Sequence, residues 1–179
     1  LKDSGADLII YGMGEKAIVE LCNKMLEGFG IKDIKDIPQT VYMTDAAGID
    51  GGFKDNDIKI HSHEECLQNK KAQAENFKVI EEESNKIHAQ RIIQAIGKEF
   101  VVVNPPYQPM TTEELDAVYD LPFTRLPHPK YKNKRIPAFD MIKFSVNIHR
   151  GCFGGCAFCT ISAHQGKFIV CRSKKSILK

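Results

Sequence analysis

The sequence contains no tryptophan and no uninterrupted apolar run of about 18 residues, the length that a membrane-spanning helix needs. We therefore expect no membrane span, and no secretory signal either, because Leu1–Ile10 lacks an apolar core of sufficient length. A cytoplasmic location is the default expectation. The formal net charge is only +2. A balance so close to zero gives no indication of nucleic acid or an anionic membrane as a partner.

Cysteine, by contrast, is concentrated near one end of the chain. Of six cysteines, four lie within residues 152–179, namely Cys152, Cys156, Cys159 and Cys171. Such clustering favours metal or redox chemistry over a disulfide scaffold. Cys22 lies among apolar residues at helical spacing and is expected to be a small buried hydrophobe. Cys66 shows no feature that suggests a site.

Residues 1–103 predict an α/β unit. Apolar residues recur at helical spacing over residues 15–29, and glycines close the segment. Residues 63–98 mostly favour helix. The apolar stripe breaks over the polar stretch Glu81–Lys86, so either two helices or one long exposed helix is possible. The strands are expected over residues 7–11, 40–44 and 100–103, with a glycine- and aspartate-rich loop over 46–56.

A proline-rich segment follows, with seven of the eight prolines lying between Pro105 and Pro137. Only Thr112–Tyr119 is expected to be helical there, with Thr111 and Glu114 spaced as a capping box. We interpret residues 105–137 as an ordered strap between two domains, because it carries large apolar side chains that favour burial: Leu121, Phe123, Leu126, Tyr131 and, just beyond it, Phe139. Its positive run, Lys130, Lys132, Lys134 and Arg135, could contact phosphate, although a solvated face is the simpler expectation.

Residues 142–149 alternate between apolar and polar side chains, which predicts a strand. The cysteine-rich loop follows directly. Beyond it, Ser173 is a plausible N-cap for a helix that begins near residue 174.

Cys152, Cys156 and Cys159 are spaced C-x3-C-x2-C. Three soft thiolates within eight residues suit iron–sulfur or zinc ligation better than catalysis by a single nucleophile. A structural zinc site usually takes four ligands, and Cys171 could supply the fourth. A 4Fe-4S cluster bound by three thiolates leaves one iron open. That arrangement allows S-adenosylmethionine (SAM) to chelate the cluster through its amino and carboxylate groups.

The residues between the cysteines fit a loop wrapped around a cluster. Gly151, Gly154 and Gly155 permit unusual backbone angles and a close approach of amides to sulfide. Phe153 and Phe158 can shield a cluster from water.

The motif with its aromatic Phe158 resembles the signature of the radical SAM superfamily, and its surroundings are similar to the YgiQ family of radical SAM proteins. The similarity is tight over residues 96–179 and traceable back to Tyr11. It rests on Ser145-Val-Asn-Ile-His149-Arg150, His164-Gln165-Gly166, Arg172-Ser173, Asn104-Pro105-Pro106, Glu114-Leu115-Asp116, Tyr119-Asp120-Leu121-Pro122 and His128-Pro129. One departure is Cys171, where a small polar residue would be expected.

By this resemblance, residues 1–140 would be part of the family's amino-terminal domain. Residues 141–179 would be the first strand, cluster loop and helix start of a partial (β/α) barrel. Cys152, Cys156 and Cys159 would ligate a 4Fe-4S cluster, while Gly155 and Phe158 would contact SAM. The reaction implied is reductive cleavage of SAM to a 5′-deoxyadenosyl radical, with an electron donor such as flavodoxin or ferredoxin and a substrate that the sequence does not identify. These 179 residues alone are not expected to turn over.

A second motif, Gly12-x-Gly14-x-x-Ala17, lies between a predicted strand and a predicted helix and formally matches a dinucleotide fingerprint. It suggests a Rossmann-like remnant and leaves a nicotinamide-dependent oxidoreductase as a distant alternative. Glu15, at the start of the helix, would repel a phosphate. No convincing acidic partner on a second strand follows it.

Overall fold

The computed structural model describes residues 1–179 and is an α/β structure, as expected from the sequence. Its strands are β1 (Leu8–Ile10), β2 (Thr40–Thr44), β3 (Ile58–Ile60), β4 (Ile92–Ile96), β5 (Glu99–Val103), β6 (His149–Arg150) and β7 (Val170–Cys171). The α-helices are α1 (Glu15–Leu26), α2 (His63–Gln68), α3 (Lys70–Ser84), α4 (Thr112–Tyr119), α5 (Pro137–Ile142), α6 (Ile161–Gln165) and α7 (Lys174–Leu178). No helix is both long enough and apolar enough to cross a membrane.

The first five strands form one sheet in the order β1-β2-β5-β4-β3. Three of its four pairings are antiparallel, and only β3 and β4 run parallel. A Rossmann fold is built on a mostly parallel sheet with a crossover helix between strands. The predicted Rossmann-like remnant is therefore not confirmed.

The expected helix over residues 63–98 is wrong in its last part. Residues 63–84 form the two helices α2 and α3, whereas Ile92–Ile96 forms strand β4. β4 pairs with β5 in a hairpin that places Ile96 opposite Glu99. Gly97 makes the turn possible, since its φ of +60° is a conformation that glycine adopts without strain.

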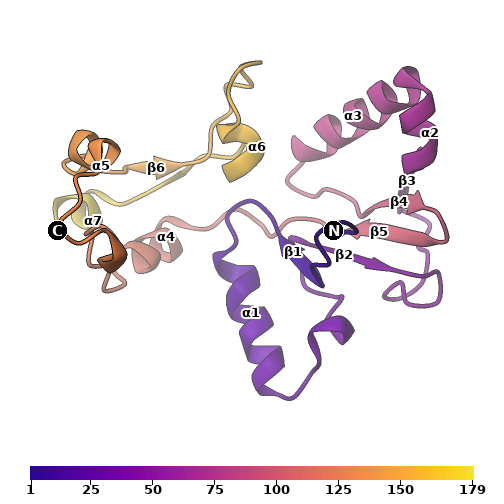
Figure 1. The fold of residues 1–179 in the computed structure, drawn as a ribbon, viewed down its shortest axis with the longest axis horizontal. Helices are drawn as coiled ribbons and strands as arrows, with labels where there is room; N and C mark the ends of the chain where they lie inside the picture. Colours follow the sequence, from indigo (N-terminus) through magenta and orange to yellow (C-terminus); the bar gives the residue numbers. More distant parts are fainter.

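The core of this unit is divided into two small clusters. Ala17 and Leu21 of α1 pack with Ile34 and Ile37, while Tyr42, Ile93 and Val102 of the sheet pack with Ile49 from the loop before β3. In Figure 1, α1 extends to one side of the sheet and α2 with α3 to the other. Cys22 was expected inside, but it is exposed, because α1 buries only the face that carries Ala17 and Leu21.

A buried ion pair fixes the loop between β2 and β3. Arg91 donates from Nε and Nη2 to the two carboxylate oxygens of Asp57, at 2.8 and 2.7 Å. It also donates to the backbone carbonyls of Asp50 and Gly52, both at 2.6 Å. The side chains of Arg91 and Asp57 are only 7% and 1% exposed, so this pair satisfies several buried polar groups at once.

The residue directly before the proline-rich strap, Asn104, is hydrogen-bonded to the segment that leads into β2. The buried side chain of Asn104 donates to the carbonyls of Lys35 and Ile37 and to the hydroxyl of Thr40, at 2.8, 3.0 and 3.0 Å. The capping box of Thr111 and Glu114 is present at the start of α4, as predicted. The expected burial of the strap's apolar side chains is not found for Leu121, Phe123, Leu126 and Tyr131, which are all exposed in a segment with little regular structure.

The segment before the cysteine loop also differs from expectation. The strand predicted over residues 142–149 is present only at His149–Arg150, because residues 137–142 form helix α5. A strand needs a partner for its backbone groups, and β7 pairs with just these two residues. The partial barrel is accordingly not confirmed. Helix α7 is present, capped by the Ser173 side chain as predicted.

A third apolar cluster joins this last part of the chain to the strap. Met110 and Leu115 pack against Val170 of β7. The cluster places β7, which follows the cysteine loop and α6, beside α4 and away from the sheet, as Figure 1 shows.

Candidate functional site

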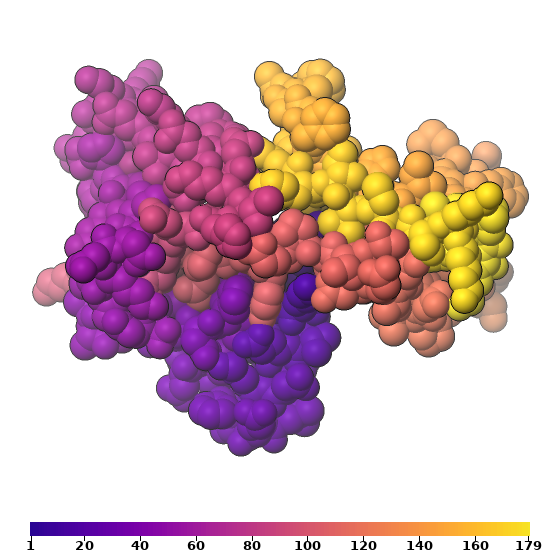
Figure 2. Space-filling model, turned by 180° about the vertical axis from the view of Figure 1, so that it is seen from behind, coloured from indigo at the N-terminus to yellow at the C-terminus, as the bar shows by residue number.

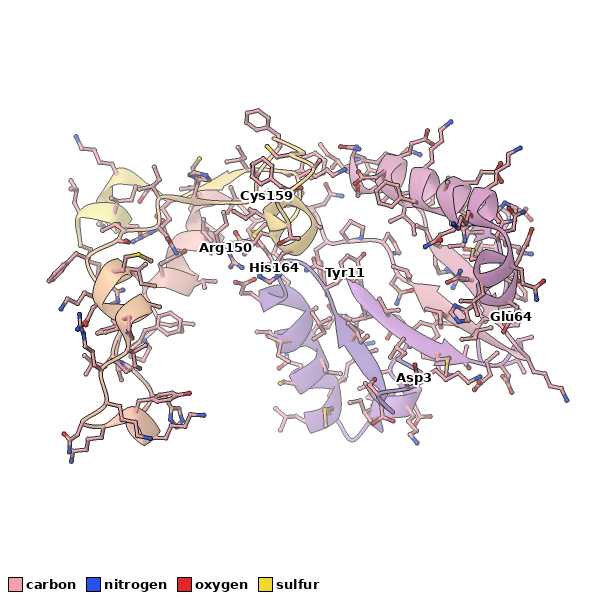
Figure 3. All side chains as sticks on the ribbon, turned by 45° about the horizontal axis from the view of Figure 1, so that its top comes forward. Asp3, Tyr11, Glu64, Arg150, Cys159 and His164 are labelled. Atoms are coloured by element: carbon pink, nitrogen blue, oxygen red, sulfur yellow. The ribbon has the colours of Figure 1, made fainter.

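The cysteine loop, residues 151–159, lies between β6 and α6. Its backbone is held at both ends: the amide of Cys152 donates to the carbonyl of Gly166 at 3.1 Å, and the amide of Cys159 donates to that of Cys156 at 3.0 Å. Figure 3 shows Cys159 at the top of the molecule, with Arg150 and His164 nearby. The three predicted ligands thus lie on one short loop that the two-stranded ladder presents at the surface.

Gly151 is required at the entrance to this loop. Its φ is +86°, and a Cβ at this position would overlap the carbonyl oxygen of Phe168. The bend between α6 and β7 therefore lies directly against the backbone of Gly151. No other residue type fits this position without moving one of the two segments.

Gly154 provides a test of whether the loop suits a cluster. A Cβ on Gly154 would lie 3.3 Å from the sulfur of Cys152 and 3.7 Å from that of Cys156. The two sulfurs therefore flank one cradle, in which a side chain at Gly154 would crowd the sulfur of Cys152, and the Gly154 amide donates to that sulfur at 3.4 Å. Amide donation to sulfur is typical of cluster-binding loops. The donor set fits a thiolate-bound cluster.

The structure does not, however, gather the ligands into a completed metal site. No three His, Cys, Asp or Glu side chains are arranged to hold a metal ion. Cys156 is exposed, whereas Cys152 and Cys159 are half-buried. Cys171 is exposed on β7, opposite His149, and does not complete a four-thiol zinc site with the other three.

The remaining predicted residues of the loop face solvent. Phe158 and Phe153 are 91% and 80% exposed, so their proposed roles beside SAM or around a cluster stay predictions. Gly155 adopts a φ of +57° with open space around it, which keeps one side of the loop free of side chains. His149 and His164, which flank the loop, are both exposed.

Two ion pairs fix the loop to the sheet unit (residues 1–103, which contain the five-stranded sheet and helices α1 to α3), and neither was predicted from the sequence. Arg150, directly before the loop, pairs with Glu15 at the first position of α1. Lys167, directly after Gly166, pairs with Glu81 of α3. The partners are separated by 135 and 86 residues, so no local pattern could have indicated them. One carboxylate oxygen of Glu15, Oε2, is buried without a hydrogen-bond partner.

The glycine turn before α1 is filled by the protein itself. Gln39 donates from its side-chain amide to the carbonyls of Tyr11 and Met13, at 2.5 and 2.7 Å. Glu15, at the start of α1, carries a carboxylate that pairs with Arg150. A dinucleotide would place its pyrophosphate at that position, so this geometry argues against nucleotide binding here.

A separate polar hollow of about 340 Å³ lies between β3, α2 and α3. At its centre, His61 contacts Glu65 through Nδ1 at 2.9 Å and Glu75 through Nε2 at 2.8 Å. The hydrogen bond to Glu75, followed by that to Glu65, raises the pKa of His61 above its ordinary value. Because the carboxylates lie on opposite sides of the ring, the three groups cannot ligate one metal ion, and we interpret them as a clamp between the two helices.

Comparison with known proteins places the chain in a family. The family model described as Radical SAM N-terminal matches residues 1–145, and the chain belongs to this family. A UPF0313 protein of Bacteroides thetaiotaomicron is 65% identical over 99% of this chain, which corresponds to 30% of that relative. UPF0313 proteins of Porphyromonas gingivalis and Methanocella arvoryzae are 54% and 46% identical over the whole chain, or 28% and 29% of their own lengths. No solved structure matches.

The resemblance to the YgiQ family of radical SAM proteins is thereby confirmed at the level of the family. The chain spans about 30% of the length of these relatives. The activity and substrate of the whole protein are therefore matters for proposal.

Proposed function

We propose that the protein carrying this chain is a radical SAM enzyme, in which Cys152, Cys156 and Cys159 ligate a 4Fe-4S cluster. The observation that carries the proposal is the cradle at Gly154, which two of the three sulfurs flank. Membership in the Radical SAM N-terminal family supports it. When bound, such a cluster supplies the electron for reductive cleavage of SAM.

The residues of this chain would position that chemistry. The thiolates would hold three irons, and the ion pairs of Arg150 and Lys167 would fix the two ends of the loop. Gly155 leaves open space on the loop for SAM, and Phe158 would cover the adenine. A cytoplasmic electron donor such as flavodoxin or ferredoxin would reduce the cluster. The solvent exposure of the loop supports access by such a donor.

The ligand assignment is tested by single Cys→Ala variants of the full-length protein, reconstituted without oxygen and analysed for iron, sulfide and visible absorption. We expect Cys152→Ala, Cys156→Ala and Cys159→Ala each to lose the cluster. Cys22→Ala and Cys66→Ala are matched controls, because neither residue lies in the loop, and both should retain full iron content. A complete cluster in Cys156→Ala would refute the assignment.

The same measurement separates the alternative of a structural zinc module. That module would be favoured if the protein held stoichiometric zinc, no sulfide and no visible absorption. In that case Cys171→Ala should also lose the zinc. Activity is a further test: 5′-deoxyadenosine should form with the reduced full-length protein. It should not form with residues 1–179 alone, which offer SAM few contacts to offset the entropic cost of binding.

A further inference from the structure

Charge is strongly segregated along this chain. Residues 121–179, here called the basic lobe, contain twelve Lys and Arg but a single acidic residue, Asp140. Residues 1–120 contain 22 acidic and 13 basic residues. The net charge of +2 for the whole chain therefore conceals a lobe of +11 beside a unit of −9. Figure 2 shows that most of this lobe, in orange and yellow, stands out to one side of the sheet unit.

Seven of the twelve cations in the basic lobe have no carboxylate partner. Arg150, Lys167 and Lys179 pair with carboxylates of residues 1–120, and Arg135 and Lys143 share Asp140. Arg172, one of the seven, bonds to Ser176 and lies 4.2 Å from the ring of Tyr119. The other six are all exposed, namely Arg125, Lys130, Lys132, Lys134, Lys174 and Lys175. Such an excess of unpaired positive charge creates a local field that attracts polyanions.

The strap presents three of these cations on a turn of defined shape. The amide of Lys130 donates to Nδ1 of His128 at 3.2 Å, and the amide of Lys132 donates to the carbonyl of Pro129 at 3.0 Å. The amide of Lys134 donates to the carbonyl of Tyr131 at 2.9 Å. The turn therefore holds the backbone while the lysine side chains project into solvent.

An aromatic ring lies among these lysines. Tyr131 is 41% exposed, and the ammonium of Lys130 lies 4.9 Å from its ring centroid. An exposed ring beside alternating cations is the combination with which proteins bind single-stranded nucleic acid, where cations contact phosphates and the ring stacks on a base. A carboxylate-rich protein partner would use the cations alone and would not require the ring.

From this arrangement we infer that the basic lobe, through the turn of residues 128–134, is a binding surface for single-stranded nucleic acid. The inference is independent of the cluster. It is opposite to the expectation drawn from the whole-chain charge, which averages two oppositely charged parts.

The test is fluorescence anisotropy of the full-length protein with a labelled single-stranded RNA of about 20 nucleotides and with single-stranded DNA of the same sequence, titrated over a range of KCl concentrations. We expect binding that weakens with salt. The variant Lys130→Gln, Lys132→Gln, Lys134→Gln should lower the slope of log K against log[KCl] by about 2, since each phosphate contact contributes about 0.7. At about 0.1 M KCl this corresponds to an affinity lower by about 100-fold.

A matched control removes three exposed lysines from α3 of the acidic unit, as Lys70→Gln, Lys71→Gln, Lys78→Gln. It should leave affinity and salt slope unchanged. Tyr131→Ala should weaken binding about tenfold without altering the slope, because stacking is not ionic, while Tyr131→Phe should bind normally.

Three results would overturn the inference. The first is the absence of binding to both RNA and DNA at low salt, including the case in which an acidic flavodoxin binds instead. The second is an equal loss of affinity in the strap variant and the α3 variant, which would show that binding depends only on the overall charge of the protein. The third is preference for duplex over single strands, which would exclude a stacking role for Tyr131. Stronger binding to RNA than to DNA, or the reverse, would identify which single strand the surface prefers.

Discussion

Arg150 and Glu15 form an ion pair that joins the residue before the cysteine loop to the first residue of α1. Both side chains are mostly shielded from water, at 21% and 29% exposure. Together with the pair of Lys167 and Glu81 on the other side of the loop, it fixes the candidate cluster site to the sheet unit at two points.

This relationship predicts a measurable coupling. In a double-mutant cycle of Arg150→Met and Glu15→Gln, followed by urea unfolding, each single variant should be destabilised, and the double variant should be less affected than the two effects combined. We expect a coupling free energy of about 1–2 kcal/mol, between the values for exposed and buried pairs. Additive effects would show that the pair does not contribute to stability.

Gly151 should tolerate no side chain. Gly151→Ala adds a methyl group against the carbonyl of Phe168 and strains a φ of +86°, so we expect a loss of about 3 kcal/mol in the free energy of unfolding. Gly97→Ala is the matched control: its φ is +60°, but nothing lies within 4 Å of the added atom. It should cost about 1 kcal/mol from backbone strain alone. Equal losses for the two variants would exclude the close contact as the cause.

The buried pair of Arg91 and Asp57 predicts a large effect of removing one partner. Arg91→Met leaves the buried Asp57 carboxylate without its cation, with only the Lys54 amide as donor, and leaves two backbone carbonyls without donors, so we expect a loss of about 3–5 kcal/mol. The variant Gln94→Met, on the same strand, is a comparison that removes only one hydrogen bond, to the carbonyl of His61 at 3.0 Å. It should cost about 1 kcal/mol.

The same pair predicts a response to acid. Burial is the largest influence and would raise the pKa of Asp57. The hydrogen bonds from Arg91 and from the Lys54 amide, together with the charges of Arg91 and Lys54, outweigh it, and the pKa is lower than in an unfolded chain. The stabilisation is therefore complete above the unfolded pKa, near 4, and is lost as the pH falls through the lower folded value. Urea unfolding of Asp57→Asn between about pH 7 and pH 3 should show a weaker acid dependence than the parent protein. An unchanged dependence would assign the acid response to other carboxylates.

His61 predicts the opposite response. Its raised pKa means that the protonated ring is favoured in the folded state, by Glu75 of α3 and Glu65 of α2. The contribution is fully present below the unfolded pKa, near 6.5, and is lost as the pH rises through the higher folded value. The nearby cations are Lys59 of β3, which lines the same hollow, and Lys71 of α3, which pairs with Glu75. The protection of amides in α2 and α3, measured by hydrogen exchange corrected for the intrinsic pH dependence of the rate, should fall above the folded pKa, and His61→Gln should abolish this fall.

The elements that could be predicted from the sequence are those defined by local patterns. The turn of α1, the capping box of Thr111 and the cysteine spacing each depend on residues a few positions apart. Strand β4 was missed because its glutamine and alanine also suit a helix, although the following Gly97 and the run Phe100–Val103 are typical of a hairpin. The strand predicted over residues 142–149 is the opposite case, an element that was predicted but is mostly absent. Alternating apolar and polar side chains fit a strand with one buried face, but a strand also needs a neighbouring strand to bond with, and β7 provides one only for His149 and Arg150.

The candidate site also contains residues that a local sequence pattern predicts and residues that only the fold brings into place. The ligand residues could be identified because three thiols in one short loop are a local signal. The residues that hold the loop in place, Glu15 and Glu81, could not, since each depends on which helices the fold brings beside it. The basic lobe is an intermediate case, visible in the sequence only when charge is counted by segment.

The position of these anchors along the chain has a consequence for biogenesis. Glu15 and Glu81 both precede the cysteine loop, and so do all five strands of the main sheet. Domains generally fold as units, the amino-terminal ones first, while the ribosome is still extending the chain. Both carboxylates would then be in place before Cys152, the first thiol of the cysteine loop, leaves the exit tunnel. The nascent loop would then emerge beside a sheet and helices that are already folded, and both of its ion-pair partners would be available as soon as Arg150 and Lys167 leave the ribosome.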